Sequence, residues 1–249
     1  MSLTLRWRSA STLPVRGESL KPETFASLSP GEAAHLVIGL GNTRIELGEL
    51  FEIDGSTGDD TLKIEGNLDH VQGIGQGMSR GKLAIEGNAG ALLGAGMSGG
   101  ELELHGHAGD WLGAEMTGGR LRVRGNVGDF AGAALPGSRL GMRGGEILVE
   151  GSGGTDIGLS MRRGLIAILG DAGDGLGRSL IAGTILLGGT ARGRIGAGMK
   201  RGSLVLLTSP PDPASFLLPT FHRAGVFPAG FLVLYKRQLA EWGFEIPVP

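Results

Sequence analysis

Three aspartates recur at one position of a regular sequence pattern, and they are the first residues that could carry chemistry. They are Asp110, Asp129 and Asp174. If the pattern stacks, their carboxylates form a file, and paired carboxylates in a groove can cleave a polysaccharide. Asp is also an ordinary turn residue. The equivalent positions of neighbouring repeats hold Ala91, Thr155 and Gly193. We therefore interpret the aspartates as turn residues.

The histidines are the second candidate, because imidazole pairs can bind a metal. The five are His35, His70, His105, His107 and His222. Only His105 and His107 are close in sequence, and they take different places in the repeat: one faces outward, the other follows a corner glycine. Surface and turn roles are therefore expected, and the sequence predicts no catalytic, cofactor-binding or metal-binding residue in this chain.

Nucleotide and cysteine chemistry also lack support. The glycine-rich segments 73–77 and 151–154 resemble phosphate loops only superficially, because a phosphate loop needs a helix directly after it and these lead to another strand. The chain has no Cys, which excludes a disulfide, a Cys-ligated zinc and an iron–sulfur cluster in the chain itself. We expect no cofactor here.

Charge and hydrophobic patterning restrict the partners. The net charge of the 249 residues is −2, which does not favour nucleic acid or an anionic membrane. The apolar runs 165–169 and 231–235 are far shorter than the ~20 residues of a membrane span. No apolar run of signal-peptide length follows the N-terminus. We expect a cytoplasmic protein without a membrane partner.

A repeat of 19 residues organises the middle of the chain. Its turns open at Gly81, Gly100, Gly119, Gly145, Gly164, Gly183 and Gly202. One spacing is 26, which indicates a seven-residue insertion near 136–142. The third residue is Leu62, Leu83, Leu102, Leu121, Ile147, Ile166, Ile185 or Leu204. The fifth is Ile64, Ile85, Leu104, Val123, Val149, Ile168, Leu187 or Leu206. Aliphatic residues two apart predict one short strand per turn with one buried face.

Three further positions recur in each repeat. Corner glycines follow the strand, and a second set, which we begin at Gly73 and continue with Gly94, lies seven residues later. The predicted third inward position is Met78, Met97, Met116, Leu135, Met161, Leu180 and Met199. Polar residues follow the corner and could bond from turn to turn, as Asn ladders do: Asn67, Asn88, His107, Asn126, Ser152, Asp171 and Thr190.

These patterns predict an all-β fold, a right-handed parallel β-helix of about 7–8 turns. The alternative, a left-handed hexapeptide helix, needs a coil of about 18 residues and fits less well. We assign residues 1–59 to an N-terminal β cap with strands at 36–41 and 45–54. Residues 60–208 form the coil, and 209–249 a partly helical C-terminal cap with a turn at 209–213 and a helix within 230–242.

The outward strand positions change character along the coil. Early turns carry charged residues, as at Glu103, Arg120 and Arg122, whereas late turns carry apolar ones, as at Leu165 and Leu186. A solvated face should not stay apolar over three turns. The C-terminal segment is expected to cover it, from 216–218 through 231–235 to Trp242. We favour capping of the coil over an interface with another protein.

The repeat resembles a known domain. Its pattern, with clear copies at 81–97, 100–116 and 145–161, is similar to the GXGXG β-helix domain. That domain occurs in the large chain of glutamate synthase and in the C subunits of formylmethanofuran dehydrogenase and of the formyltransferase/hydrolase complex. Segment 13–55, with Lys21–Phe25 and Gly41–Gly55, is similar to the stretch before the coil in these C subunits.

The resemblance implies a non-catalytic structural subunit in one-carbon metabolism. The bacterial complex takes a formyl group from formyl-tetrahydromethanopterin through a methanofuran-type carrier to formate. Its implied partners are an amidohydrolase-like A subunit, a B subunit, and a formyltransferase D subunit. The C subunit of a tungsten or molybdenum formylmethanofuran dehydrogenase is the alternative. A second alternative, from the residues alone, is a free-standing β-helix enzyme acting on a polymer or an acyl donor.

Overall fold

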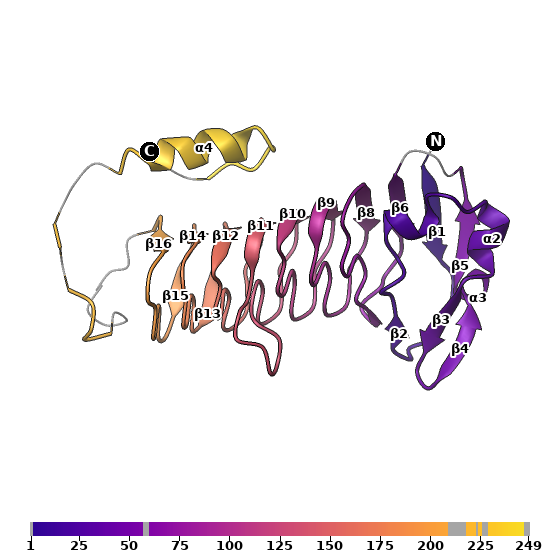
Figure 1. Ribbon diagram of the computed structural model, residues 1–249, viewed down its shortest axis with the longest axis horizontal. Coiled ribbons are helices and arrows are strands. Elements are labelled where there is room, and N and C mark those ends of the chain that lie inside the picture. The colour runs from indigo at the N-terminus through magenta and orange to yellow at the C-terminus, as the bar shows by residue number, and fades with distance from the viewer. Residues whose placement is uncertain (1, 57–59, 209–217, 223, 226–228, 247–249) are drawn as a thin grey trace.

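The computed structural model describes residues 2–56, 60–208, 218–222, 224–225 and 229–246. The molecule is a long coil with a small α/β cap at its N-terminal end and one helix along its side (Figure 1). Strands dominate, and the helices are short: α1 (Pro22–Phe25), α2 (Pro30–Ala34), α3 (Leu47–Leu50) and α4 (Leu232–Ala240).

One parallel sheet runs the length of the coil, with one strand from each turn. In order along the sheet these are β6 (Thr61–Glu65), β8 (Lys82–Glu86), β9 (Ser98–Leu104), β10 (Gly118–Val123), β11 (Arg143–Val149), β12 (Arg163–Ile168), β14 (Thr184–Leu187) and β16 (Ser203–Leu206). Leu83, Leu102 and Leu121 are direct partners in adjacent strands, and each is at most 1% exposed. The predicted parallel β-helix of about eight turns is confirmed; its right-handed sense stays a prediction.

Two more walls of small and aliphatic residues close each turn. Parallel bridges join Leu68, Ala89, Ala108, Val127, Gly153 and Ala172 in sequence. The short strands β13 (Ala172–Asp174) and β15 (Ala191–Arg192) continue this wall. A further buried row consists of Ile74, Leu93, Leu112, Ala131, Ile157, Leu176 and Ile195. The coil is therefore a filled core with no open channel along the turns that these rows line.

Glycine is required where the inner aliphatics of a later turn fill the corner. Gly94 has φ +64°, and a Cβ there would lie 2.6 Å from Cδ1 of Leu121. The equivalent residue one turn earlier is Gly75, whose Cβ would meet Leu102. Our alignment placed Gly73 there, which is wrong. The two extra residues of that turn precede Gly75, where the chain forms β7 (Val71–Gln72) beside the N-terminal cap.

The methionine row also needs one correction. Leu135 is only half-buried, whereas Met142 is fully buried and its carbonyl accepts from the N–H of Arg162 at 2.9 Å. Met116 and Met161 take the same place in neighbouring turns. The insertion therefore precedes Met142. The chain leaves the coil after Ala134 and returns at Met142, whose side chain is large and flexible enough to fill the core.

The N-terminal cap contributes a strand that the repeat did not predict. β1 (Leu3–Trp7) pairs in parallel with β6 and antiparallel with β5 (Phe51–Asp54), so the main sheet has ten strands. β2 (Val15–Arg16), β3 (Val37–Leu40) and β4 (Thr43–Glu46) join β7 in a second sheet. The strand predicted at 45–54 is broken by α3. Trp7 packs edge-on against Phe51, with ring centroids 5.1 Å apart.

The C-terminal segment covers a side of the coil more than its end. Helix α4, expected within 230–242, lies along the outer face of the late strands (Figure 1). Among the described tail residues, Phe221 lies at the end of the coil, since a Cβ added to Gly196 would lie 2.9 Å from Cζ of its ring. The predicted turn at 209–213 and residues 216–217 lie outside the described residues.

Candidate functional site

The three aspartates singled out from the sequence are bonded to backbone. Oδ1 of Asp110 accepts from the N–H of Asp129 at 2.8 Å, and Oδ1 of Asp129 accepts from the N–H of Thr155 at 2.6 Å. Asp174 accepts from the N–H and the guanidinium of Arg194, and these hydrogen bonds lower the pKa of Asp174. Each carboxylate therefore stabilises the next turn of the coil along the chain. This geometry supports the interpretation as turn residues.

A second ladder satisfies the corner backbone. The side chains of Asn88, His107, Asn126, Ser152 and Asp171 each accept a hydrogen bond from the backbone N–H of the corresponding residue one turn later, at 2.7–3.1 Å. The predicted turn-to-turn bonding is confirmed from Asn88 to Thr190. The ladder continues over five steps because each of these side chains carries an acceptor atom that the backbone N–H of the next turn can reach.

The histidines do not converge on one point. His107 accepts at Nδ1 within the ladder, while His105 lies on the strand face between Glu86 at 2.8 Å and Glu103 at 3.3 Å. His35 pairs with Glu46 at 2.9 Å, His70 packs against Trp7, and His222 is exposed. Across the described residues, no group of three His, Cys, Asp or Glu side chains could hold a metal.

The outer face of the strands is the surface whose chemistry varies most. One column of directly paired outward residues runs along it: Lys63, Ala84, Glu103, Arg122, Leu148, Ala167, Leu186 and Val205. The column is polar or small up to β10 and apolar from β11 on. The inward columns beside it do not change, so the two halves share a core and differ in their surface.

In the early half of this face, ion pairs join side chains of different turns. Arg124 bonds Glu103 at 2.8 Å, and Arg120 lies 3.2 Å from Glu101. For Glu103, burial alone would raise the pKa, but the hydrogen bond and charge of Arg124 outweigh it and the pKa is lowered. Such pairs at the surface contribute little stability but give the face a fixed charge pattern.

The late half is covered by the chain's own tail. Leu148, Ala167 and Leu186 pack against Leu239 of α4 and Phe244 just after it, and all five are at most 1% exposed. Burial of this apolar area removes the patch from water at roughly 25 cal/mol per Å2. The expectation that the C-terminal segment covers the apolar strands is confirmed for its described part.

Polar contacts fix the tail in register with the strands. Arg122 donates to the carbonyls of Trp242 and Gly243, each at 2.9 Å, and also bonds Glu150. The guanidinium of Arg120 lies 3.8 Å from the centroid of the Trp242 ring, an attractive cation–π geometry.

Sequence reasoning placed both arginines on a solvated face and missed this role. One signal in the sequence could have indicated it: the two arginines lie in the last turn before the outward positions become apolar.

Two groups of α4 itself add to this attachment. Tyr235 hydroxyl lies 3.0 Å from Oγ1 of Thr184, and Gln238 donates to Glu146 at 3.1 Å. Burial raises the pKa of Glu146, although the hydrogen bonds from Arg120 and Gln238 oppose this. The covered face is therefore an intramolecular interface with a polar rim.

No protein-family model matches the chain. The C subunit of the molybdenum-containing formylmethanofuran dehydrogenase 1 of Methanothermobacter marburgensis is 36% identical over 94 residues, 37% of this chain and 24% of that protein. The C subunit of the formyltransferase/hydrolase complex Fhc of Methylorubrum extorquens is 35% identical over 91 residues, 33% of this chain and 34% of that protein. These alignments thus span about a quarter to a third of the curated relatives.

A solved structure extends the likeness over nearly the whole chain. It is the crystal structure of the formyltransferase/hydrolase complex (FhcABCD) from Methylorubrum extorquens with methylofuran. One of its chains is 34% identical, with a TM-score of 0.85, over 97% of this chain and 88% of that chain. In the described parts of our chain, no helix is long and apolar enough to cross a membrane. The chain belongs to the C-subunit family shared by formylmethanofuran dehydrogenases and the formyltransferase/hydrolase complex.

Proposed function

We propose that this chain is a structural subunit of a formyltransferase/hydrolase complex and carries no active site of its own. The observation that carries the proposal is the match to a chain of the FhcABCD complex over 97% of this chain. The candidate carboxylates support it, since Asp110, Asp129 and Asp174 are bonded to backbone of the next turn. A rod with a filled core and a fixed surface suits the role of a scaffold.

The complex would move a formyl group from formyl-tetrahydromethanopterin through a methanofuran-type carrier to formate. The bond-breaking steps would belong to the partners, which are an amidohydrolase-like A subunit, a B subunit, and a formyltransferase D subunit. This chain would bind no cofactor and would hold the partners in place.

The C subunit of a formylmethanofuran dehydrogenase is the second candidate. The identity to that relative, 36%, is within one percentage point of the identity to the Fhc relative. The nearly complete structural match favours the formyltransferase/hydrolase complex. The free-standing enzyme is disfavoured, because the acids that it would need serve the turns.

Co-expression tests the proposal. The chain, tagged at its N-terminus, is produced with the A, B and D subunits of the formyltransferase/hydrolase complex and, separately, with the corresponding dehydrogenase subunits. We expect one large species containing all four proteins in the first case, measured by size-exclusion chromatography with light scattering. A chain that elutes alone at its own mass in both cases would overturn the proposal.

A further inference from the structure

A cluster of cations occupies one corner of the late turns. Backbone hydrogen bonds to the methionine row align Arg143, Arg162 and Lys200 at one position of their turns, through the carbonyls of Met116, Met142 and Leu180. Arg163 and Arg201 follow Arg162 and Lys200 in sequence. We call these five residues the basic corner. All five are exposed, and neighbouring turns lie about 4.8 Å apart.

The basic corner differs from most of the other arginines of the coil. Arg120, Arg122, Arg124, Arg178 and Arg194 each contact a carboxylate. Among the described residues, no carboxylate oxygen lies within 4.0 Å of a basic-corner side chain. In the early turns the same corner carries Ser79, Arg80, Ser98, Gly99, Thr117 and Gly118, and its one cation, Arg80, lies 3.4 Å from a carboxylate oxygen of Asp60. The unpaired charge at this corner therefore belongs to the late turns.

Uncompensated like charges on adjacent turns repel one another, so they are unfavourable in the isolated chain. An anionic surface laid along the corner would reverse this effect. The turn between Arg162–Arg163 and Lys200–Arg201 places Ile181 and Ala182 at the corner, which makes the surface a mixture of Arg, Lys and aliphatic side chains. Such a mixture suits a protein interface, in which Arg is enriched, better than an uninterrupted phosphate track.

We infer that the basic corner docks an acidic protein surface, rich in Asp and Glu side chains, of another subunit of the complex. This inference rests on the proposed function, which supplies the partner. The corner would give the association its orientation and its rate, because complementary charge steers encounter and penalises wrong partners. The apolar residues at 181–182 would make the buried contact between the two basic pairs.

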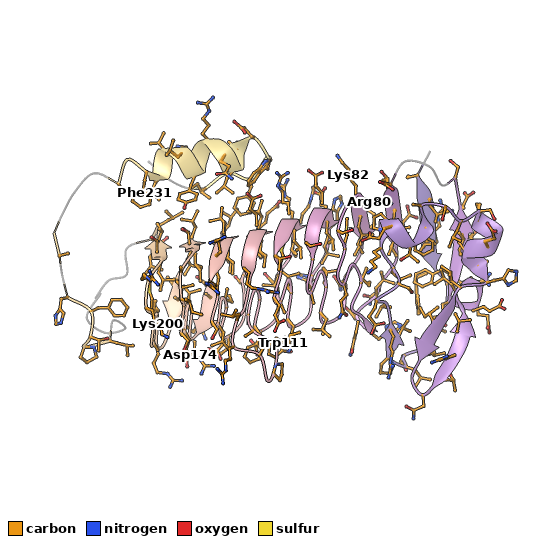
Figure 2. The ribbon with its side chains drawn as sticks, in the orientation of Figure 1. Arg80, Lys82, Trp111, Asp174, Lys200 and Phe231 are labelled. Carbon is orange, nitrogen blue, oxygen red and sulfur yellow. The ribbon has the colours of Figure 1, made fainter. Side chains whose placement is uncertain are left out.

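Charge reversal tests the inference in the assembled complex. The variant R162E/R163E changes the net charge by −4 on two exposed residues and leaves the buried core untouched. The matched control is R16E/R44E, which makes the same change on two exposed residues of the N-terminal cap. The cap lies at the opposite end of the coil from Lys200 (Figure 2). Thermal unfolding should be similar for the two variants.

We expect R162E/R163E to weaken association with the A, B and D subunits at least about tenfold, and the control to change it less than about twofold. Raising the salt concentration should weaken the wild-type association and reduce the difference between the variants.

Assembly of the wild type together with equal assembly by both variants would overturn the inference while leaving the proposed function intact. The same holds if the two reversals weaken assembly equally, or if R162E/R163E loses only binding of duplex DNA by the free chain. Failure of the wild type itself to assemble would instead overturn the proposed function.

Discussion

The two halves of the coil have the same interior and different surfaces. Residues 60–133 contain six Lys or Arg and nine Asp or Glu, whereas residues 134–208 contain nine and five. The early outer face carries ion pairs in water, and the late one is apolar and covered by α4. Inward positions must satisfy one packing pattern in every turn, so they stay constant. Outward positions are free of that demand, so their chemistry can differ between the two halves.

The largest difference in stability should appear when an alanine is replaced by lysine at two positions of the outward column, one in each half of the coil. Ala84 and Ala167 occupy this column in the early and the late half. Ala167 is fully buried under the tail, so A167K should lower the free energy of unfolding or of α4 docking by about 3–5 kcal/mol, the effect of an unpaired buried charge. A84K should stay within about 0.5 kcal/mol.

Chemical denaturation together with hydrogen exchange of α4 measures both variants. Equal effects of A84K and A167K would mean that the late face is not covered, and the comparison between the halves would fail.

The second-largest difference is expected between two leucines of helix α4. Leu239 is fully buried against the late strands and Leu234 is 71% exposed. L239A should weaken docking of α4 by about 2–5 kcal/mol, because it removes buried methyl groups and leaves a cavity. L234A should change it by less than about 0.5 kcal/mol. Amide exchange rates of α4 give the docking free energy, and similar rates in the two variants would contradict the packing described.

Two neighbouring arginines give a smaller contrast. Arg122 bonds two carbonyls of the tail as well as Glu150, whereas Arg124 pairs only with Glu103 on the exposed face. R122A should cost about 1.5–3 kcal/mol through lost charge-assisted hydrogen bonds. R124A should cost about 0.2–1 kcal/mol. If urea titrations found R124A the more damaging of the two, the tail would not be anchored at Arg122.

The smallest effect is a difference in pH dependence. The lowered pKa of Glu103 adds stability above the unfolded pKa, which is lost as pH falls through the folded pKa. The raised pKa of Glu146 acts oppositely, with stability present below the unfolded pKa and lost as pH rises through the folded pKa. At pH 7, E103Q should therefore destabilise the fold and E146Q should stabilise it, each relative to the wild type.

Both differences from the wild type should shrink as the pH falls below the folded-state pKa of Glu103 and the unfolded-state pKa of Glu146. Unfolding free energies at several pH values measure them. Differences of the same sign at pH 7 would show that the two faces do not differ in burial.

The sequence predicted the inward rows because their spacing alone requires them. Leu83, Leu102 and Leu121 recur every 19 residues and stack as expected. The alignment wrongly put Leu135 and Gly73 into the repeat, because each is of a type that fits and the extra residues could lie before or after it. Only the packing in the structure shows that Met142 and Gly75 take those places. β1 was missed, since one strand outside the repeat has no period to reveal it.

The candidate site was less predictable. The turn role of Asp110 and Asp129 followed from residue type, but the anchoring by Arg122 depends on where the tail returns to the coil, which no local pattern encodes. Arg143 joins the basic corner only after the turns are aligned through Met142.

A formate-release assay tests whether this chain carries an active site of its own. Formate release from a formyl donor is measured for the chain alone, for the A, B and D subunits without it, and for all four proteins together. We expect no turnover by the chain alone and full turnover in the assembled complex, unchanged by D110N, D129N or D174N in this chain. Turnover by the isolated chain, lost in one of these variants, would contradict this expectation.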